Sequence, residues 1–589
     1  MASPFGARRS TIKTAQKPSP ATEADLEGQV LERRCRVALV GVVLVMFTTV
    51  CFLSLKPVTW PASYFNDMAI LMAGENYAKH GFIKLHLLPV YFIGDLSDEA
   101  GYYTYYSHTP PLFHLFNGLL QTAGIHSLAV MRIICGCLFI VGVVCMYSAF
   151  APAIGPLAAV CGVGFIGTTG WFISYGVGLY DTLNFFFLGV FFLFFMRAVH
   201  RDGPAGRLWL VCWFLLMLAS MNSYEFILYA QVFAWAYAWA AGRLRAAWRP
   251  LLLLALAPVV SIGLHFLQVV WALGWTAAWA DRLGFSYVRG GIDGLSARWD
   301  YMKRLPGFLI DMSQQVFFWP FHVFVLAGVL WLIGVSRKRD NDDRALTSGP
   351  LLWALLLASP TWFLAMPYAA VRNIYTVQQL VPLVVAVMGI VTAVVGRALF
   401  AGHTPPVVRY LAALAGIMLL FGQGYSMWDN AQGHKDQLAI LAEAIGPDAL
   451  PPRVGVLTND GTIPVAYFIR RPWWRVPNME PVPPIPFPEA LGMLQKHIPP
   501  DWPIRYYLYA SWGDPGPFQL LATTCPGRVL KLSGGQNFLV LFDISNLHLP
   551  PDKRPPLDPQ VREGQLRGEF PEWQIPGLGE RVARLTQGR

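Results

Sequence analysis

Charged residues are scarce in this chain. Only 14% of its 589 residues are Asp, Glu, Lys or Arg, whereas 55% are hydrophobic, and soluble domains average about 25% charged residues. Such a composition excludes a disordered chain and a coiled coil. Cysteine is also rare: there are eight, and Cys525 is the only one in residues 429–546, which excludes a disulfide scaffold. We therefore expect a polytopic α-helical membrane protein.

The positive charge is unevenly distributed along the chain. The formal net charge is +10, yet residues 429–589 contain 16 Lys and Arg and 16 Asp and Glu. The excess of positive charge thus lies within residues 1–428. A nucleic-acid-binding protein would gather basic residues on one face of a folded domain, so we expect no nucleic-acid partner.

Eleven segments are long and apolar enough to cross a bilayer, which takes about 20 residues. A further apolar segment at 111–123 is short, as interfacial or re-entrant segments are, and we expect it to stay outside the membrane within a loop at 57–127. Two additional short spans would raise the number to thirteen. The eleven predicted spans are 37–55, 128–150, 154–174, 180–196, 208–223, 226–242, 251–274, 314–335, 350–366, 377–396 and 408–425.

Basic residues indicate the orientation. With eleven spans, the N-terminal segment and four later groups of Lys and Arg fall on one face, which we interpret as cytoplasmic. The opposite face then carries the loops 57–127 and 275–306 and the C-terminal region. No Asn-x-Ser/Thr sequon occurs in the chain, which favours a bacterial inner membrane with a periplasmic C-terminal domain.

The sequence divides into four regions. The sequence predicts a disordered basic cytoplasmic N-terminus at residues 1–36 and the membrane domain at 37–425. Residues 429–546 read as a soluble α/β domain that stabilises the protein or docks an acceptor, and the tail 547–589, rich in proline and charge, as disordered. Within the α/β domain we expect a helix and four strands of a partly parallel sheet, at Lys435–Ile445, Val454–Leu457, Tyr506–Tyr509, Val529–Leu532 and Phe538–Phe542.

Two polar stretches stand out in the first external loop, which is net negative. Asp67 lies in the first turn of an amphipathic helical pattern that ends at Gly81. An acidic residue there can simply complement the helix dipole, and that alternative stays open. Further on, His108 follows a tyrosine cluster and precedes Pro110-Pro111. The tyrosines suit a membrane interface; alternatively, they line a wet site together with His108.

More ionisable residues lie at the same end of the predicted spans. They are Arg132, Asp181, Glu225 and Arg372. Ionisable residues at membrane depth are costly and are therefore functional candidates. Each alone can instead be an anchor at the end of a helix.

The order of these motifs resembles a known family. The sequence has one span, an external helix with Asp67 near its start, the pattern Ala73, Asn76, Tyr77 and Gly81, then His-Thr-Pro-Pro-Leu at 108–112, Arg132, and Asp181 opening a Phe-rich span. It resembles the integral-membrane glycosyltransferases of the GT-C fold, in the branch of the protein O-mannosyltransferases, lipid A aminoarabinose transferases and lipopolysaccharide galacturonosyltransferases. The resemblance covers roughly residues 37–425. Many relatives have Asp-Glu where this chain has Asn66-Asp67-Met68, so a single carboxylate remains here.

The resemblance implies an enzyme that moves a monosaccharide from a polyprenyl-phosphate carrier to a glycan, lipid or protein acceptor on the non-cytoplasmic face, by inverting displacement. Asp67 would be the general base, and Arg372, Arg132 and His108 would bind the donor phosphate. Asp181 and Glu225 would orient the acceptor or hold a divalent cation, although no ligand spacing demands a metal.

Three alternatives remain open at the sequence level. One is a non-enzymatic assembly or receptor scaffold, which the C-terminal domain suggests. A lipid-linked polysaccharide polymerase or ligase would use a lipid-diphosphate oligosaccharide. A secondary transporter is disfavoured because the chain lacks repeated halves and paired broken helices.

Overall fold

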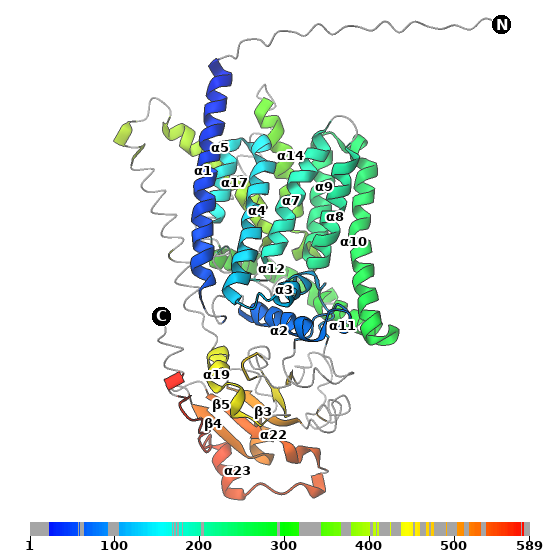
Figure 1. The fold of residues 1–589 in the computed structure, drawn as a ribbon, viewed down its shortest axis with the longest axis vertical. Coiled ribbons are helices and arrows are strands. Elements are labelled where there is room, and N and C mark those ends of the chain that lie inside the picture. The colour runs from blue at the N-terminus through cyan, green and yellow to red at the C-terminus, as the bar shows by residue number, and fades with distance from the viewer. Residues whose placement is uncertain are drawn as a thin grey trace, which may run out of the picture.

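The structure is a computed structural model. It describes residues 23–56, 64–91, 105–167, 181–201, 205–290, 295–316, 343–366, 378–400, 437–451, 454–459, 504–511, 518–531, 538–549 and 551–578, together with short stretches between them. A long helical bundle lies above a smaller sheet domain (Figure 1).

Within its described residues, the bundle contains five helices that are long and apolar enough to cross a membrane, at 29–54, 128–154, 182–200, 244–273 and 378–397, and shorter apolar helices at 156–166, 206–222 and 349–365. These helices match eight of the predicted spans, and α9 lies at the position of a ninth. The predicted spans near 314–335 and 408–425 fall almost entirely outside the described residues. The bundle helices are α1 (Glu23–Ser54), α4 (Leu128–Ile154), α5 (Pro156–Ile166), α7 (Asp181–His200), α8 (Gly206–Asn222), α9 (Glu225–Ala240), α10 (Leu244–Leu273), α14 (Asp343–Ala358), α15 (Thr361–Ala365) and α17 (Val381–Phe400).

Glycines allow two pairs of bundle helices to approach closely. A Cβ added at Gly189 of α7 would lie 2.1 Å from the Gly142 carbonyl oxygen of α4, and one added at Gly389 of α17 would lie 2.1 Å from the Ala158 carbonyl oxygen of α5. Small residues at such contacts let backbones pack directly, which is how membrane helices gain van der Waals energy in the absence of a hydrophobic driving force.

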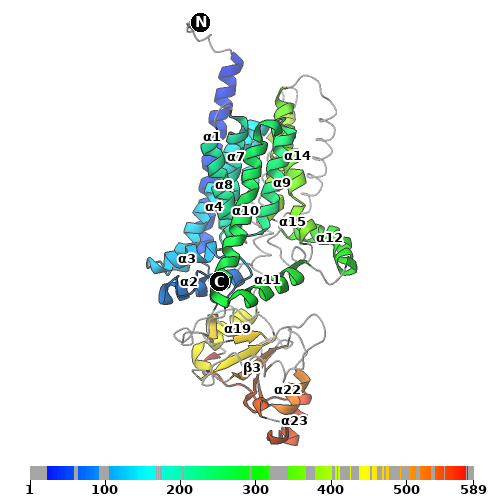
Figure 2. The same cartoon turned by 90° about the vertical axis from the view of Figure 1, so that its right-hand side faces the viewer.

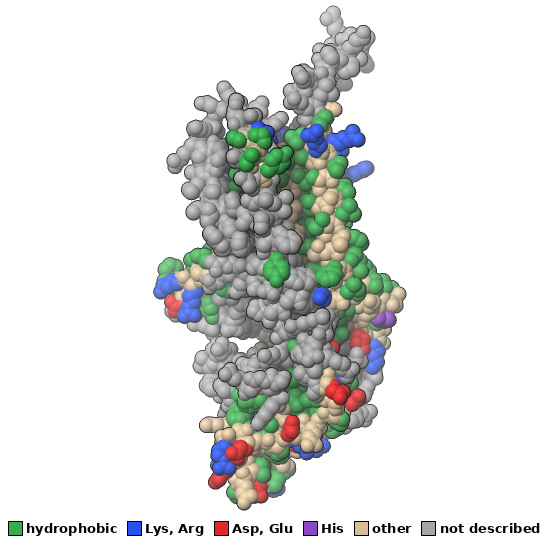
Figure 3. All heavy atoms as spheres, turned by 90° about the vertical axis from the view of Figure 1, so that its left-hand side faces the viewer, with side chains coloured by type: hydrophobic (Ala, Val, Ile, Leu, Met, Phe, Trp, Pro, Cys, Tyr) green, Lys and Arg blue, Asp and Glu red, His purple; other side chains and the backbone are tan. Residues whose placement is uncertain are grey.

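Helix α1 exposes apolar side chains to the surroundings of the bundle. Val37, Val40 and Val45 are more than half exposed. In Figure 3 hydrophobic side chains follow the length of this helix, whereas Lys and Arg gather near its N-terminal end. A continuous exposed apolar surface of this kind fits a lipid environment.

A group of helices lies across the lower end of the bundle, next to the sheet domain (Figures 1 and 2). We call this the domain-side end. The helices are α2 (Tyr64–His80), α3 (Leu112–Thr122), α11 (Trp275–Gly290) and α12 (Leu295–Val316). The predicted amphipathic helix is thus α2, but it is buried on two sides: Met68 and Met72 pack towards the bundle, and Ala73 and Tyr77 share a buried cluster with the sheet domain.

The described residues of the sheet domain form a mixed five-stranded sheet in the order β2-β1-β3-β5-β4. Strand β1 is parallel to β2 and β3, whereas β5 is antiparallel to β3 and β4. The prediction of a partly parallel sheet is confirmed. Its elements are α19 (Gln437–Ile445), β1 (Gly455–Thr458), β2 (Trp473–Arg475), β3 (Ile504–Ala510), α22 (Phe518–Thr524), β4 (Gly527–Lys531), β5 (Phe538–Asp543) and α23 (Pro559–Leu566).

The prediction of a disordered tail at 547–589 is wrong over its described part. Helix α23 follows an Asp558 cap, and Trp573 is buried against the sheet. The buried Gln565 amide accepts a hydrogen bond from the Gly527 N–H at 2.6 Å and donates to the Cys525 carbonyl at 3.0 Å. Polar composition suggested disorder, but these side chains and backbone hydrogen bonds between the tail and β4 hold the segment on the domain.

The predicted disorder of residues 1–36 is likewise wrong from residue 23 onward. Helix α1 begins at Glu23, well before the apolar span. Glu32 and Arg36 pair at i and i+4 on its exposed face, a spacing that supports helices.

The close contact between α4 and α7 can be tested with an added methyl group. We expect Gly189→Ala to lower the midpoint of thermal unfolding in detergent, because a Cβ would collide with backbone; overpacking typically costs about 1–3 kcal/mol. Gly263→Ala is the matched control, since nothing lies within 4 Å of a Cβ there. Equal midpoints for wild type and Gly189→Ala would contradict the close contact.

Candidate functional site

A fully buried ion pair lies at the domain-side end. The guanidinium of Arg132 in α4 donates to Oδ2 of Asp67 in α2 through Nη2 at 2.8 Å and Nε at 3.1 Å, and both side chains are 0% exposed. The Leu179 N–H donates to Oδ1 at 2.8 Å. Arg132 Nη1 donates to the Lys56 carbonyl at 2.8 Å. One pair thus ties together the end of α1, α2, α4 and the segment before α7.

The charge state of this pair follows from its partners. Burial raises the pKa of the Asp67 carboxyl, while the Arg132 guanidinium and the Leu179 N–H act in the opposite direction. A guanidinium does not give up its proton in proteins, so a neutral Asp67 would leave an uncompensated buried cation. The ionic form of the pair is therefore the one that satisfies both groups. Removing one partner of such a pair costs about 3–5 kcal/mol.

The structure describes some of the other predicted site residues and not others. Glu225 begins α9, is 6% exposed, and accepts a hydrogen bond from Gln378 Nε2 at 2.9 Å. Asp181 begins α7, two residues after Leu179, but its side chain is outside the described set. Arg372 lies outside the described residues. The structure thus brings Asp67 and Arg132 into contact and places Glu225 in a separate polar contact.

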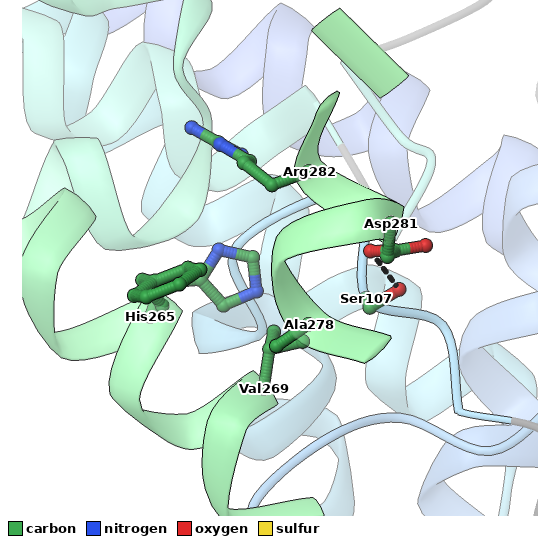
Figure 4. Close-up of a pocket in the computed structure, with 7 residues that line it drawn as sticks. Ser107, His265, Val269, Ala278, Asp281 and Arg282 are labelled. Atoms are coloured by element: carbon green, nitrogen blue, oxygen red, sulfur yellow. Dashed lines mark hydrogen bonds between the residues drawn. The ribbon is translucent and has the colours of Figure 1, made fainter. Parts of the chain in front are cut away.

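His108 belongs to a second, more accessible cluster. Its Nδ1 lies 3.6 Å from Oδ1 of Asp281 in α11, and the His108 and Asp281 side chains are 40% and 24% exposed. Ser107 donates to the other Asp281 oxygen at 2.8 Å. Figure 4 shows Ser107 and Asp281 beside a small cavity of about 10 Å³, room for about one water molecule.

The cluster continues into the bundle through Tyr224. Arg282 donates to the Tyr224 hydroxyl at 3.4 Å and lies over its ring at 4.9 Å. That hydroxyl also pairs with Nδ1 of His265 at 2.5 Å. Nε2 of His265 is buried without a hydrogen-bond partner among the described residues. The small cavity is thus lined by one carboxylate, one imidazole and one guanidinium, and the His108 imidazole lies next to the carboxylate.

Sequence reasoning missed Asp281, Arg282, Tyr224 and His265. The loop 275–306 was predicted to lie on the outer face, but no residue in it was singled out. His265 carried a usable signal, because a lone ionisable residue within an apolar span is a functional candidate. Asp281 carried none, since it contacts Ser107 from 174 residues away.

A further polar contact joins α3 to the segment that follows α2. The Tyr91 hydroxyl pairs with Nε2 of His114 at 2.7 Å. Burial lowers the pKa of His114 to about 3, because the charged imidazolium would lose its hydration there. His114 therefore stays neutral at ordinary pH.

Potential metal-ligating side chains do not form a cluster in the described part of the chain. Among the described residues, no group of three or more His, Cys, Asp or Glu side chains is arranged to hold a metal ion.

The fold is similar to those of solved membrane glycosyltransferases. ArnT from Cupriavidus metallidurans bound to undecaprenyl phosphate matches with a TM-score of 0.51 and 14% identity, over 87% of this chain and 99% of that chain. The oligosaccharyltransferase of Archaeoglobus fulgidus tethered to an acceptor peptide gives 0.50 and 12%, over 88% of this chain and 75% of the other. The same organism's AglB with an inhibitory peptide and a dolichol-phosphate gives 0.47 and 11%, over 87% and 75%.

At the level of sequence, neither a protein-family model nor a curated protein matches the chain. The structural likeness extends over the bundle and the sheet domain together. The chain thus has the GT-C fold of membrane glycosyltransferases, as its motif order suggested.

The buried His114 predicts a pH dependence. Its folded-state pKa is about 3, below the value of about 6.5 in an unfolded chain, so the unfolded state binds more protons between these values. Stability should be unaffected by His114 above about pH 6.5 and fall by up to about 1.4 kcal/mol per pH unit below it.

We expect His114→Asn to flatten the decline in unfolding midpoint between pH 6.5 and 5. The exposed His126 provides the control, because His126→Asn should leave the wild-type decline in place. An identical decline in the His114 variant and wild type would show that His114 is not responsible.

Proposed function

We propose that this protein is a glycosyltransferase that moves a sugar from a polyprenyl-phosphate carrier to an acceptor hydroxyl at the domain-side end, which we assign to the non-cytoplasmic face. The observation that carries the proposal is the gathering of ionisable residues at one end of a bundle with the GT-C fold. ArnT, whose fold it shares, was solved with undecaprenyl phosphate, which supports a carrier of that class.

The chemistry needs a base and a cation. The acceptor oxygen forms a bond to the anomeric carbon while the bond from that carbon to the carrier phosphate breaks. The base takes the hydroxyl proton in the transition state, and the departing phosphate keeps the bonding electrons. A guanidinium can hold that phosphate through two parallel hydrogen bonds.

Two groups are candidates for the base. Asp67, the candidate from sequence, has both oxygens engaged and is fully enclosed, so the acceptor could reach it only after α2 or the Leu179 segment moved. His108 is accessible, and Asp281 beside it could orient the imidazole and stabilise its charged form. Because His108 is accessible, we favour His108 with Asp281 as the base. Asp67 is the alternative, and the variants described below distinguish the two assignments.

The proposed role of Arg132 also changes, because Arg132 is enclosed together with Asp67. Nε, Nη1 and Nη2 of Arg132 donate to Asp67 and Lys56, so we propose a positioning role for Arg132. Arg282, in the accessible cluster, and Arg372 are the proposed phosphate-binding residues. Asp181 and Glu225 remain proposed acceptor-orienting residues.

Under the accessible-base assignment, His108→Asn and Asp281→Asn should each lower kcat, by about 10²- to 10⁴-fold for His108. The unfolding midpoint should barely change, because both side chains are partly exposed. Transfer would be measured with purified protein and the polyprenyl-phosphate sugar identified by mass spectrometry of co-purified lipid. Wild-type rates in both variants would rule out this pair as the base.

Asp67→Asn should lower both the transfer rate and the unfolding midpoint, because it leaves the Arg132 charge unpaired. The double variant Asp67→Asn/Arg132→Gln removes both charges and should recover the unfolding midpoint. Recovery of transfer along with it would assign the pair a positioning role. A stable but inactive double variant, with active His108 and Asp281 variants, would instead assign the base to Asp67.

A further inference from the structure

Two neighbouring cavities lie at the end of the bundle opposite the sheet domain. One, of about 880 Å³, is formed between the end of α7, the start of α8 and the start of α10. The other, of about 590 Å³, is formed between α4, α7, α9, α14 and the turn before α10. In Figure 1 these helix ends lie at the top of the bundle, far from α2 and α11. The cavities are therefore separate from the proposed transfer site.

Basic side chains line both cavities. Arg201 and Arg243 line the larger one, and Arg197 and His200 line the smaller one together with the same Arg243. Among the residues that the structure describes, no acidic side chain lines either cavity. The charge of this surface is complementary to an anion.

Helix geometry adds to the positive potential. Helices α8 and α10 both begin at the larger cavity, and neither has a side-chain cap at its N-terminus. The first N–H groups of a helix and its dipole favour negative charge at that end. Two helix N-termini and two arginines thus converge on one space, and a phosphate group suits both kinds of donor.

The remaining walls are apolar and open to the surroundings of the bundle. Trp209, Trp213 and Leu254 line the larger cavity. Leu210 and Leu253 on its rim are 66% and 60% exposed. Tryptophan is enriched at the level of lipid headgroups, and exposed leucines suit acyl chains. A soluble anion would leave these walls unpartnered, whereas a lipid would cover them.

We propose that this pair of cavities binds an anionic glycerophospholipid of the adjacent leaflet, with its phosphodiester between Arg201 and Arg243 and its acyl chains along Trp213 and the rim leucines. Basic pockets between membrane helices bind such headgroups in other proteins. The lipid would bridge the ends of α7, α8 and α10 that line the larger cavity. The proposal is independent of the sugar-transfer reaction.

The wild-type protein provides the first test. Delipidated full-length protein in detergent would receive phosphatidylglycerol, phosphatidylcholine with the same acyl chains, or undecaprenyl phosphate, and bound lipid would be counted by native mass spectrometry. We expect phosphatidylglycerol to be retained about 10- to 30-fold better than phosphatidylcholine and to raise the unfolding midpoint. Equal retention of the two phospholipids, or preferred retention of undecaprenyl phosphate, would overturn the proposal.

The second test compares two double variants that remove the same charge. Arg201→Gln/Arg243→Gln should lose the preference for phosphatidylglycerol. Arg245→Gln/Arg249→Gln is the control, because these arginines are exposed near the start of α10 but line neither cavity. An equal loss in both double variants, or no loss in the first, would show that the cavities do not hold the phosphate.

Discussion

The buried ion pair between Asp67 and Arg132 is the constraint on which the domain-side end depends. Two charges taken out of water are costly unless their hydrogen bonds are satisfied, and here both carboxylate oxygens and the three guanidinium nitrogens have partners. These partners come from four separate segments. Helix α2, which carries Asp67, packs against the bundle on one side and shares a buried cluster with the sheet domain on the other. A disturbance of the pair would therefore reach the bundle, the external helices and the domain together.

The long apolar helices and most strands could be predicted from local sequence, because their signals repeat within the element itself. Helices α4, α7 and α10 follow continuous apolar segments, and β3 and β5 follow β-type runs between turn residues. The prediction of a disordered tail failed because the contacts that order the tail are not local in the sequence. Its order depends on Trp573 and Gln565 finding partners on β4 and before it, which composition does not reveal.

The site was only partly predictable. Asp67, Arg132, Glu225 and His108 could be found because an ionisable residue next to an apolar span is unusual. Their partners could not be found, since Asp67 meets Arg132 across 65 residues and Glu225 meets Gln378 across 153. Pairing also changed the interpretation of Asp67: a lone carboxylate suggests a base, whereas an enclosed carboxylate with a guanidinium suggests a structural tie. Asp281, the partner of the accessible His108, became visible only once α11 was placed beside Ser107.

Helix α7 relates the two ends of the bundle. It begins at Asp181, beside the segment that binds Asp67, and ends at His200, beside the basic cavities. Its 20 residues span about 30 Å at 1.5 Å per residue, close to the thickness of a bilayer's hydrocarbon core. A lipid phosphate at Arg201 and a carrier phosphate at Arg282 would therefore lie near opposite membrane surfaces, too far apart for one lipid headgroup to serve both. Helix α7 also packs closely on α4 through Gly142 and Gly189, so the proposed lipid would stabilise the bundle at one end without entering the chemistry at the other.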